Sequence, residues 1–186
     1  MIKKYILSIV LITANLTLMA QALAPPTPSI EAGIYTSAVE LELTHLEAGV
    51  SIFYTLNGEV PSVSDILYSG PITLDNIDGE DDVFSIIPTN PNLTYPFGTY
   101  SAGRASSRGW VPPYTDSYKA NVVRYKAFKP GFAPSPTVTQ TFIIDPSGTG
   151  LYTMPIVSIA MDYTNIFSDE EGIYVYGDHE DGNYEQ

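Results

Sequence analysis

The side chains of this chain that could do chemistry are carboxylates, two histidines and many aromatic rings, and cysteine is absent. Without cysteine, thiol catalysis, zinc–thiolate sites and iron–sulfur clusters are excluded. The histidines His45 and His179 could be placed in a Ser-His-Asp set on paper, but the sequence has no Gly-x-Ser-x-Gly elbow for a nucleophile. We interpret both histidines as surface residues and expect no catalytic residues and no enzymatic activity.

Two acidic stretches carry oxygen ligands of the kind that calcium prefers. They are residues 75–82, DNIDGEDD, and residues 168–172, SDEEG, the second followed by Asp178, Glu180 and Asp181. Neither has the Asp-x-Asp-x-Asp-Gly order of an EF-hand loop. We interpret both as solvated turns and expect no metal site and no cofactor.

Four aromatic residues between positions 95 and 114 form the candidate ligand site. Flat rings offer apolar faces and polar edges, so they could make a platform on which sugars stack. The competing interpretation is packing in the core or in loops, which is the commoner fate of aromatic residues. The candidate residues are Tyr95, Tyr100, Trp110 and Tyr114.

The elements that would position these groups are short strands. Residues 39–44 alternate apolar and polar side chains, as in a strand with one buried and one wet face. No stretch keeps a helical period, and Gly and Pro turn signals such as Asn57-Gly58 are frequent. We predict an all-β, immunoglobulin- or fibronectin-like sandwich over residues 25–145, after a proline-rich spacer. Its further strands are expected at 50–56, 70–74, 118–128 and 137–144.

Residues 75–116 do not follow this regular spacing. A structureless loop of that length is uncommon inside a compact domain. We expect a long inserted loop that runs over the sandwich, with one additional strand possible at Val83–Ile87.

The first residues resemble a secretion signal. Lys3 and Lys4 precede an apolar run, and Ala20-Gln21-Ala22 has the small-x-small pattern of a cleavage site. An uncleaved membrane anchor is the alternative, but a spanning helix needs about 20 apolar residues, and polar residues interrupt this run. We expect residues 1–22 to be a bacterial signal peptide, and the mature protein to be secreted, extracellular or at the cell surface, without a membrane segment.

The charge balance narrows the classes of partner. With 8 Lys and Arg against 21 Asp and Glu, the formal net charge is −13. Loss of Lys3 and Lys4 with the leader would make the chain more acidic still. Such a chain repels phosphate backbones and anionic lipids, so nucleic acids and membrane surfaces are unfavourable partners.

The pattern restarts near the end of the chain. Residues 146–153 indicate a linker, and residues 154–161, MPIVSIAM, have the composition of a buried strand. Asp162 could begin a single helical turn through Phe167, Gly172 would reverse the chain, and residues 173–176 form another apolar run. We expect residues 154–186 to be a short β fragment, the start of a second domain rather than a frayed tail.

Two stretches carry a family resemblance. GIY at 33–35, YTLNGEVP at 54–61, LYSGP at 67–71 and AFKPGFAPS at 127–135 resemble the C-terminal domain of chitobiase and β-hexosaminidase. The resemblance covers residues 28–144 and implies a sandwich with no catalytic residues of its own.

The closing stretch is similar to the opening segment of the CotH family, the spore-coat-protein-H-type kinases. The matching residues are PIVS at 155–158, Asp162, NIF at 165–167 and GIYV at 172–175. In that family the nucleotide- and metal-binding residues lie further downstream, so none is carried over to this chain.

Three hypotheses for function follow. The first is a secreted, non-catalytic accessory module, the amino-terminal part of a longer CotH-family protein, that positions or attaches the downstream domain, with a cell-surface glycan or polysaccharide as a further partner. The second is the amino-terminal portion of an atypical protein kinase or phosphotransferase with its catalytic residues beyond residue 186. The third is a stand-alone carbohydrate-binding protein.

Overall fold

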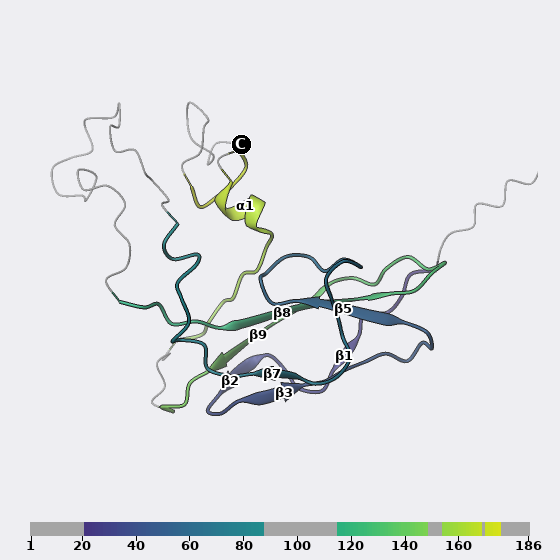
Figure 1. The fold of residues 1–186 in the computed structure, drawn as a ribbon, viewed down its shortest axis with the longest axis horizontal. Coiled ribbons are helices and arrows are strands. Elements are labelled where there is room, and N and C mark those ends of the chain that lie inside the picture. The colour runs from purple at the N-terminus through teal and green to yellow at the C-terminus, as the bar shows by residue number, and fades with distance from the viewer. Residues whose placement is uncertain (1–20, 88–114, 149–153, 169, 176–186) are drawn as a thin grey trace, which may run out of the picture.

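The computed structural model describes residues 21–87, 115–148, 154–168 and 170–175. Within these ranges the chain is almost entirely β, with one short helix (Figure 1). The strands are β1 Thr27–Pro28, β2 Gly33–Tyr35, β3 Val39–Leu41, β4 Leu43–Thr44, β5 Ser51–Thr55, β6 Ile66–Leu67, β7 Ile72–Leu74, β8 Asn121–Phe128 and β9 Val138–Ile144, and the helix is α1 Tyr163–Phe167.

The strands form the two layers of a sandwich, which confirms the predicted fold class. One layer is a five-stranded sheet in the order β2-β9-β8-β5-β6, antiparallel except where β2 joins β9. The other consists of the pairs β1-β4 and β3-β7. Only Glu42 separates β3 from β4, and its carbonyl accepts a hydrogen bond from the Ser29 amide at 2.8 Å. The two pairs therefore make one continuous layer.

Alternation along the strands places the core between the layers. Leu41 and Leu43 are buried while Glu40 and Glu42 are exposed, as their spacing predicts. The buried cluster draws on both layers and consists of Leu41, Leu43, Ile52, Ile72, Leu74, Val123, Tyr125, Phe142 and Ile144.

One polar group lies deep in this core. Tyr125 is fully buried, and its hydroxyl donates to Gln140 Oε1 at 3.1 Å. The Gln140 amide in turn donates to the carbonyl of Ile30 at 3.2 Å. Burial raises the pKa of Tyr125 to about 12, because a phenolate would lose its hydration there. The hydroxyl is thus kept neutral and hydrogen-bonded.

The proline-rich stretch before residue 30 is part of the sandwich and not only a spacer. Thr27 and Pro28 pair with Thr44 and Leu43 as an edge strand. Proline is tolerated at an edge because the hydrogen bond that it cannot donate is not needed there. Contacts begin even earlier, since Ala22 bridges to Ala133.

The acidic turn at 75–82 holds together the two ends of the inserted loop. Lys119 donates through its amide to Asp78 Oδ1 at 2.7 Å and through its ammonium to Asp82 Oδ1 at 2.8 Å. The hydrogen bond from the Lys119 ammonium lowers the pKa of Asp82, and the same contact raises the pKa of Lys119. The strand expected at Val83–Ile87 is not formed; these residues make turns and bends.

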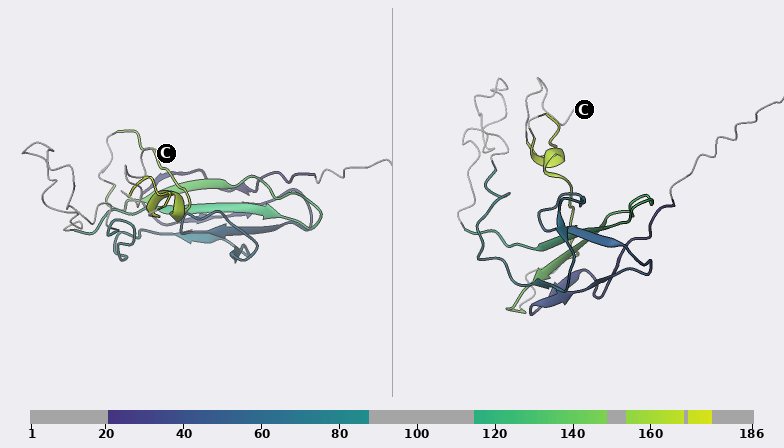
Figure 2. Two further views of the ribbon diagram at one scale, coloured as in Figure 1. Left: turned by 90° about the horizontal axis from the view of Figure 1, so that it is seen from above. Right: turned by 45° about the vertical axis from the view of Figure 1, so that its right-hand side comes forward.

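Residues 154–175, called here the docked segment, leave the sandwich on the outer side of the five-stranded sheet (Figures 1 and 2). The Ser158 hydroxyl lies 2.7 Å from that of Thr141 on β9. The helical turn expected after Asp162 is present as α1, but the strands expected at 154–161 and 173–176 are absent from the described part of this segment. A strand needs a neighbour for its backbone groups, and residues 154–158 lie beside β9 and the edge strand β2 without pairing with either.

Among the described residues, no helix is both long enough and apolar enough to cross a membrane.

Candidate functional site

A buried arginine fastens the docked segment to the sandwich. Arg124 on β8 has a side chain only 11% exposed, and its Nη1 lies 3.0 Å from Asp162 Oδ1. The same nitrogen donates to the carbonyl of Gly58, and the Val60 amide donates to the same Asp162 oxygen at 3.0 Å. We call these four residues the anchor. It joins parts of the chain that are far apart in sequence around one charge-assisted contact.

The anchor also determines how α1 begins. Asp162 is the residue before the helix, but its side chain makes no hydrogen bond to the helix. The first-turn amide of Tyr163 instead donates to Glu59 Oε1 at 3.0 Å. The first amides of a helix have no partner within the helix and favour a negative charge. A sandwich carboxylate therefore caps the helix in place of the usual local residue.

After α1 the chain folds back on the helix. The amides of Ile173 and Tyr174 donate to the carbonyls of Asn165 and Ile166 at 3.1 and 2.9 Å. Gly172 makes the approach possible, since a Cβ there would lie 2.6 Å from the Ile166 carbonyl oxygen. The Asn-Ile-Phe and Gly-Ile-Tyr motifs are thus the two sides of one compact turn.

Four aromatic rings gather around this turn. Phe84, from the inserted loop, stacks on Phe167 with ring centroids 5.5 Å apart and planes at 4°. Phe167 also contacts Tyr163 at 5.4 Å and Tyr174 edge to face at 5.7 Å. The inserted loop and the docked segment therefore meet through their rings.

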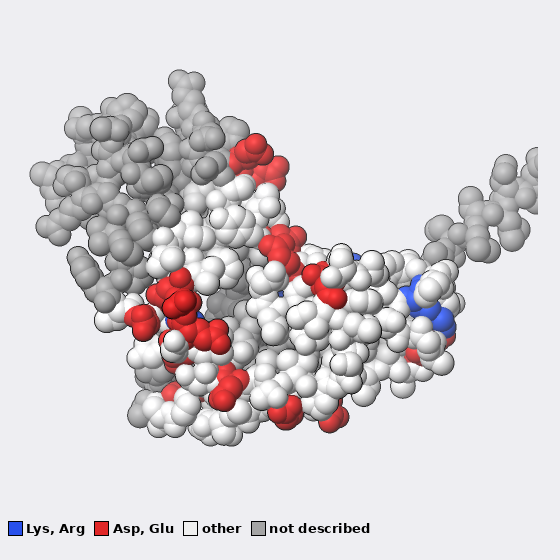
Figure 3. Space-filling model, viewed as in Figure 1, with Lys and Arg blue, Asp and Glu red and all other residues white. Residues whose placement is uncertain are grey.

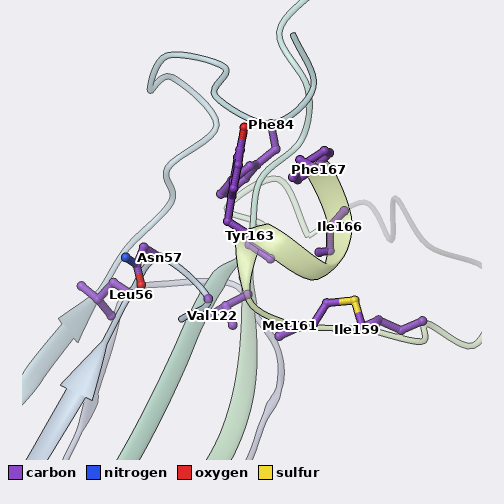
Figure 4. Close-up of a pocket in the computed structure, with 12 residues that line it drawn as sticks. Leu56, Asn57, Phe84, Val122, Ile159, Met161, Tyr163, Ile166 and Phe167 are labelled. Carbon is purple, nitrogen blue, oxygen red and sulfur yellow. The ribbon is translucent and has the colours of Figure 1, made fainter. Parts of the chain in front are cut away.

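A hollow of about 320 Å³ lies between these rings and the end of the sandwich (Figure 4). Its walls come from the turn after β5, the inserted loop, β8 and the docked segment. The lining residues are Leu56, Asn57, Gly58, Phe84, Ala120, Val122, Ile159, Ala160, Met161, Tyr163, Ile166 and Phe167. This is the candidate functional site.

Carboxylates lie near the hollow, but among the described residues none lines it. A second hollow shares Asn57 and Phe84 with the first and has Glu80 and Asp81 in its wall. Acidic side chains gather on this face, and the largest basic area in view lies at the opposite end of the sandwich (Figure 3). Acidic groups outnumber the basic residues Lys119 and Arg124 in this region, which disfavours anions.

The predicted platform residues Tyr95, Tyr100, Trp110 and Tyr114 lie outside the described residues, so their arrangement stays a prediction. The sequence interpretation missed the ring cluster of Phe84, Tyr163, Phe167 and Tyr174. Its rings come from the inserted loop, from α1 and from the chain that folds back on α1, so no periodic pattern marks them. The one available signal was the closeness of Phe167 to the helical turn predicted after Asp162.

His45 is held in a turn by local hydrogen bonds. The Glu47 amide donates to its Nδ1 at 3.0 Å, and its Nε2 donates to the Ala24 carbonyl at 2.8 Å. This accords with a structural surface role, while His179 lies outside the described residues. Within the described ranges, no three side chains of His, Asp or Glu are grouped as a metal site.

The architecture defines an immunoglobulin-like β-sandwich module. Residues 30–78, from just before β2 to just after β7, match the family model of the chitobiase/beta-hexosaminidase C-terminal domain. This confirms that part of the resemblance seen in the sequence. No curated protein and no solved structure gave a significant match. The resemblance of residues 154–186 to the CotH family stays a prediction from its motifs.

Proposed function

We propose that this chain is a secreted, non-catalytic accessory module that positions the polypeptide following its docked segment. The observation that supports this role is the anchor, in which Asp162 binds both the buried Arg124 and the Val60 amide. A flexible linker would have no such contact with the sandwich. The anchor fixes the orientation of the docked segment relative to the sandwich. The polypeptide that follows the segment would therefore leave the sandwich in a defined direction.

The exposed residues just before the anchor support the same proposal. Met154, Val157 and Ile159 are 78%, 83% and 77% exposed although they are large and apolar. Contiguous exposed apolar residues mark surfaces that another structure covers. A downstream domain of the same polypeptide, of the CotH type, is the partner that we propose for this surface.

A distance measurement tests the positioning role. Because the chain has no cysteine, Val63→Cys on the sandwich and Ile173→Cys on the docked segment would be the only sites for spin labels. We expect double electron–electron resonance on the full chain to give a narrow distribution of distances between the two labels. The Asp162→Ala substitution should broaden that distribution. A broad distribution before the anchor is mutated would show that the segment is not held.

The alternative that the complete protein is a kinase or phosphotransferase depends on residues beyond 186. The coding sequence past the codon for Gln186 tests it. A downstream domain with Asp, Asn and Lys in a kinase-like arrangement would support it, and a continuing reading frame without them would leave only the positioning role.

Attachment to a cell-surface glycan is a further part of the proposal. The matched family is named after chitobiase and beta-hexosaminidase, and aromatic rings are suited to sugar stacking. Retention of the Trp110→Ala variant on insoluble polysaccharides tests the predicted platform. Retention equal to that of the unaltered chain would exclude Trp110 from it.

A further inference from the structure

The hollow beside α1 has the size of a small ligand pocket. Its volume of about 320 Å³ is at the lower end of the range for ligand pockets, roughly 300–1,000 Å³. Leu56 and Val122 form its wall on the sandwich side, and Met161 and Tyr163 form its wall on the docked side (Figure 4). The hollow therefore exists only while the docked segment lies against the sandwich.

The rings beside the hollow are exposed yet ordered. Phe84 and Tyr163 are each 47% exposed, although both pack against Phe167. A ligand that covered them would bury apolar surface without first having to immobilise the side chains. The rings are thus prepared to bind a flat apolar face.

Two of the residues that line the hollow, Asn57 and Tyr163, carry polar groups. Asn57 accepts the Glu59 amide through Oδ1 at 3.1 Å, and among the described residues its Nδ2 group has no partner. The Tyr163 hydroxyl is likewise without a described partner. Apolar ring faces beside amide and hydroxyl groups match a sugar, which has C–H faces and hydroxyl edges.

The surrounding charge selects among sugars. Glu59 caps α1, and Glu80 and Asp81 line the adjoining hollow. The basic residues nearby are each paired with a carboxylate, Lys119 with Asp82 and Arg124 with Asp162. The carboxylates of Glu59, Glu80 and Asp81 form no ion pair among the described residues and would repel uronic acids and phosphorylated sugars. They impose no such penalty on an uncharged sugar.

We infer that this hollow binds an uncharged sugar residue of a polysaccharide, with Phe84 and Tyr163 covering its face and Asn57 contacting its edge. This inference rests on the proposed docking, because the docked segment provides half of the residues that line the hollow.

Affinity electrophoresis of the full chain in gels containing hydroxyethylcellulose, galactomannan, xylan or alginate tests the site. At least one of the three neutral polymers should slow migration, and the anionic alginate should not. Phe84→Ala and Tyr163→Ala should each weaken that retardation by about tenfold, since each removes a ring face. Tyr163→Phe keeps the ring and should weaken it less, and Val63→Ala, at an exposed position away from the hollow, should leave it unchanged.

The spin-label distance separates loss of the site from loss of docking. A variant that loses retardation while keeping a narrow distance distribution identifies the ring as a binding residue. If no neutral polymer retards the chain, or if both alanine variants keep full retardation, the sugar site is overturned even where docking is intact. A broad distribution in the unaltered chain would instead overturn the docking on which the hollow depends.

Discussion

The core of the sandwich and the first residues of the docked segment, 154–159, differ in the exposure of their apolar side chains. In the sandwich, Leu41 and Phe142 are fully buried, whereas Val157 and Ile159 of the segment are mostly exposed. The sandwich is held by its own core, while the segment is held by a few polar contacts, a ring cluster and the buried Val175. The difference teaches that burial maintains the module, whereas the segment is suited to contact something else.

Substitution of a core residue of the sandwich should have the largest effect on the free energy of unfolding. Phe142→Ala removes a ring that is fully buried and should lower the free energy of unfolding by about 3–5 kcal/mol. Val157→Ala removes apolar atoms that already face water and should change it by less than about 0.5 kcal/mol. Urea denaturation of both variants measures the contrast, and a large cost at Val157 would show that the segment has a core of its own.

The next largest effect should come from the turn that closes the docked segment. Gly172→Ala places a Cβ against two backbone carbonyls, those of Ile166 and Ser168, each 2.6 Å away. We expect a local cost of about 1–3 kcal/mol, because overpacked atoms force the backbone to shift. Limited proteolysis should then cut within 163–175 and spare the sandwich. Gly79→Ala, where a Cβ would meet open space, is the matched control.

A smaller effect should follow from the anchor. Asp162→Ala leaves the Arg124 guanidinium without its carboxylate and the Val60 amide without its acceptor. Asp162 is partly exposed, so we expect a cost of about 1–2 kcal/mol. Asp162→Asn keeps an acceptor oxygen and should cost less. Equal stability of all three proteins in urea would indicate that the anchor contributes nothing.

The smallest effect is the pH dependence at the base of the inserted loop. The Lys119 hydrogen bond lowers the pKa of Asp82, so its contribution is present above the unfolded value of about 4 and is lost as the pH falls through the lowered pKa. The raised pKa of Lys119 means that its own contribution is lost only above about pH 10.4. The pair therefore acts across the whole range between these limits.

The Ser117 amide, which donates to Asp82 at 3.3 Å, reports this titration by NMR. The midpoint of the change in its chemical shift should lie at a pH below the pKa of a free aspartate. The Asp82→Asn substitution should abolish the change. Asp81→Asn, which removes the neighbouring exposed carboxylate, is the control. A midpoint at the ordinary aspartate value would mean that the ion pair is not formed in solution.

The sequence predicted the parts of the fold that local pattern determines. Alternation at 39–44 indicated a strand, and Asn57-Gly58 marked a turn in which Gly58 has a φ of 86°. The contact of Arg124 with Asp162 left no such trace, because Arg124 occupies an ordinary outward position on its strand. The apolar run at 154–161 predicted a buried strand. Its composition indicates that these residues are buried by something, but it does not indicate which structure buries them.

The central claim is that the docked segment is fixed to the sandwich from Asp162 onward, while its first residues, 154–159, stay open. Amide hydrogen exchange of the full chain, followed by NMR, tests it directly. We predict slow exchange at Val60 and Tyr174, whose amides bind Asp162 and the Ile166 carbonyl, and fast exchange at Val157 and Ile159. Exchange at Val60 and Tyr174 as fast as at Val157 would contradict the account.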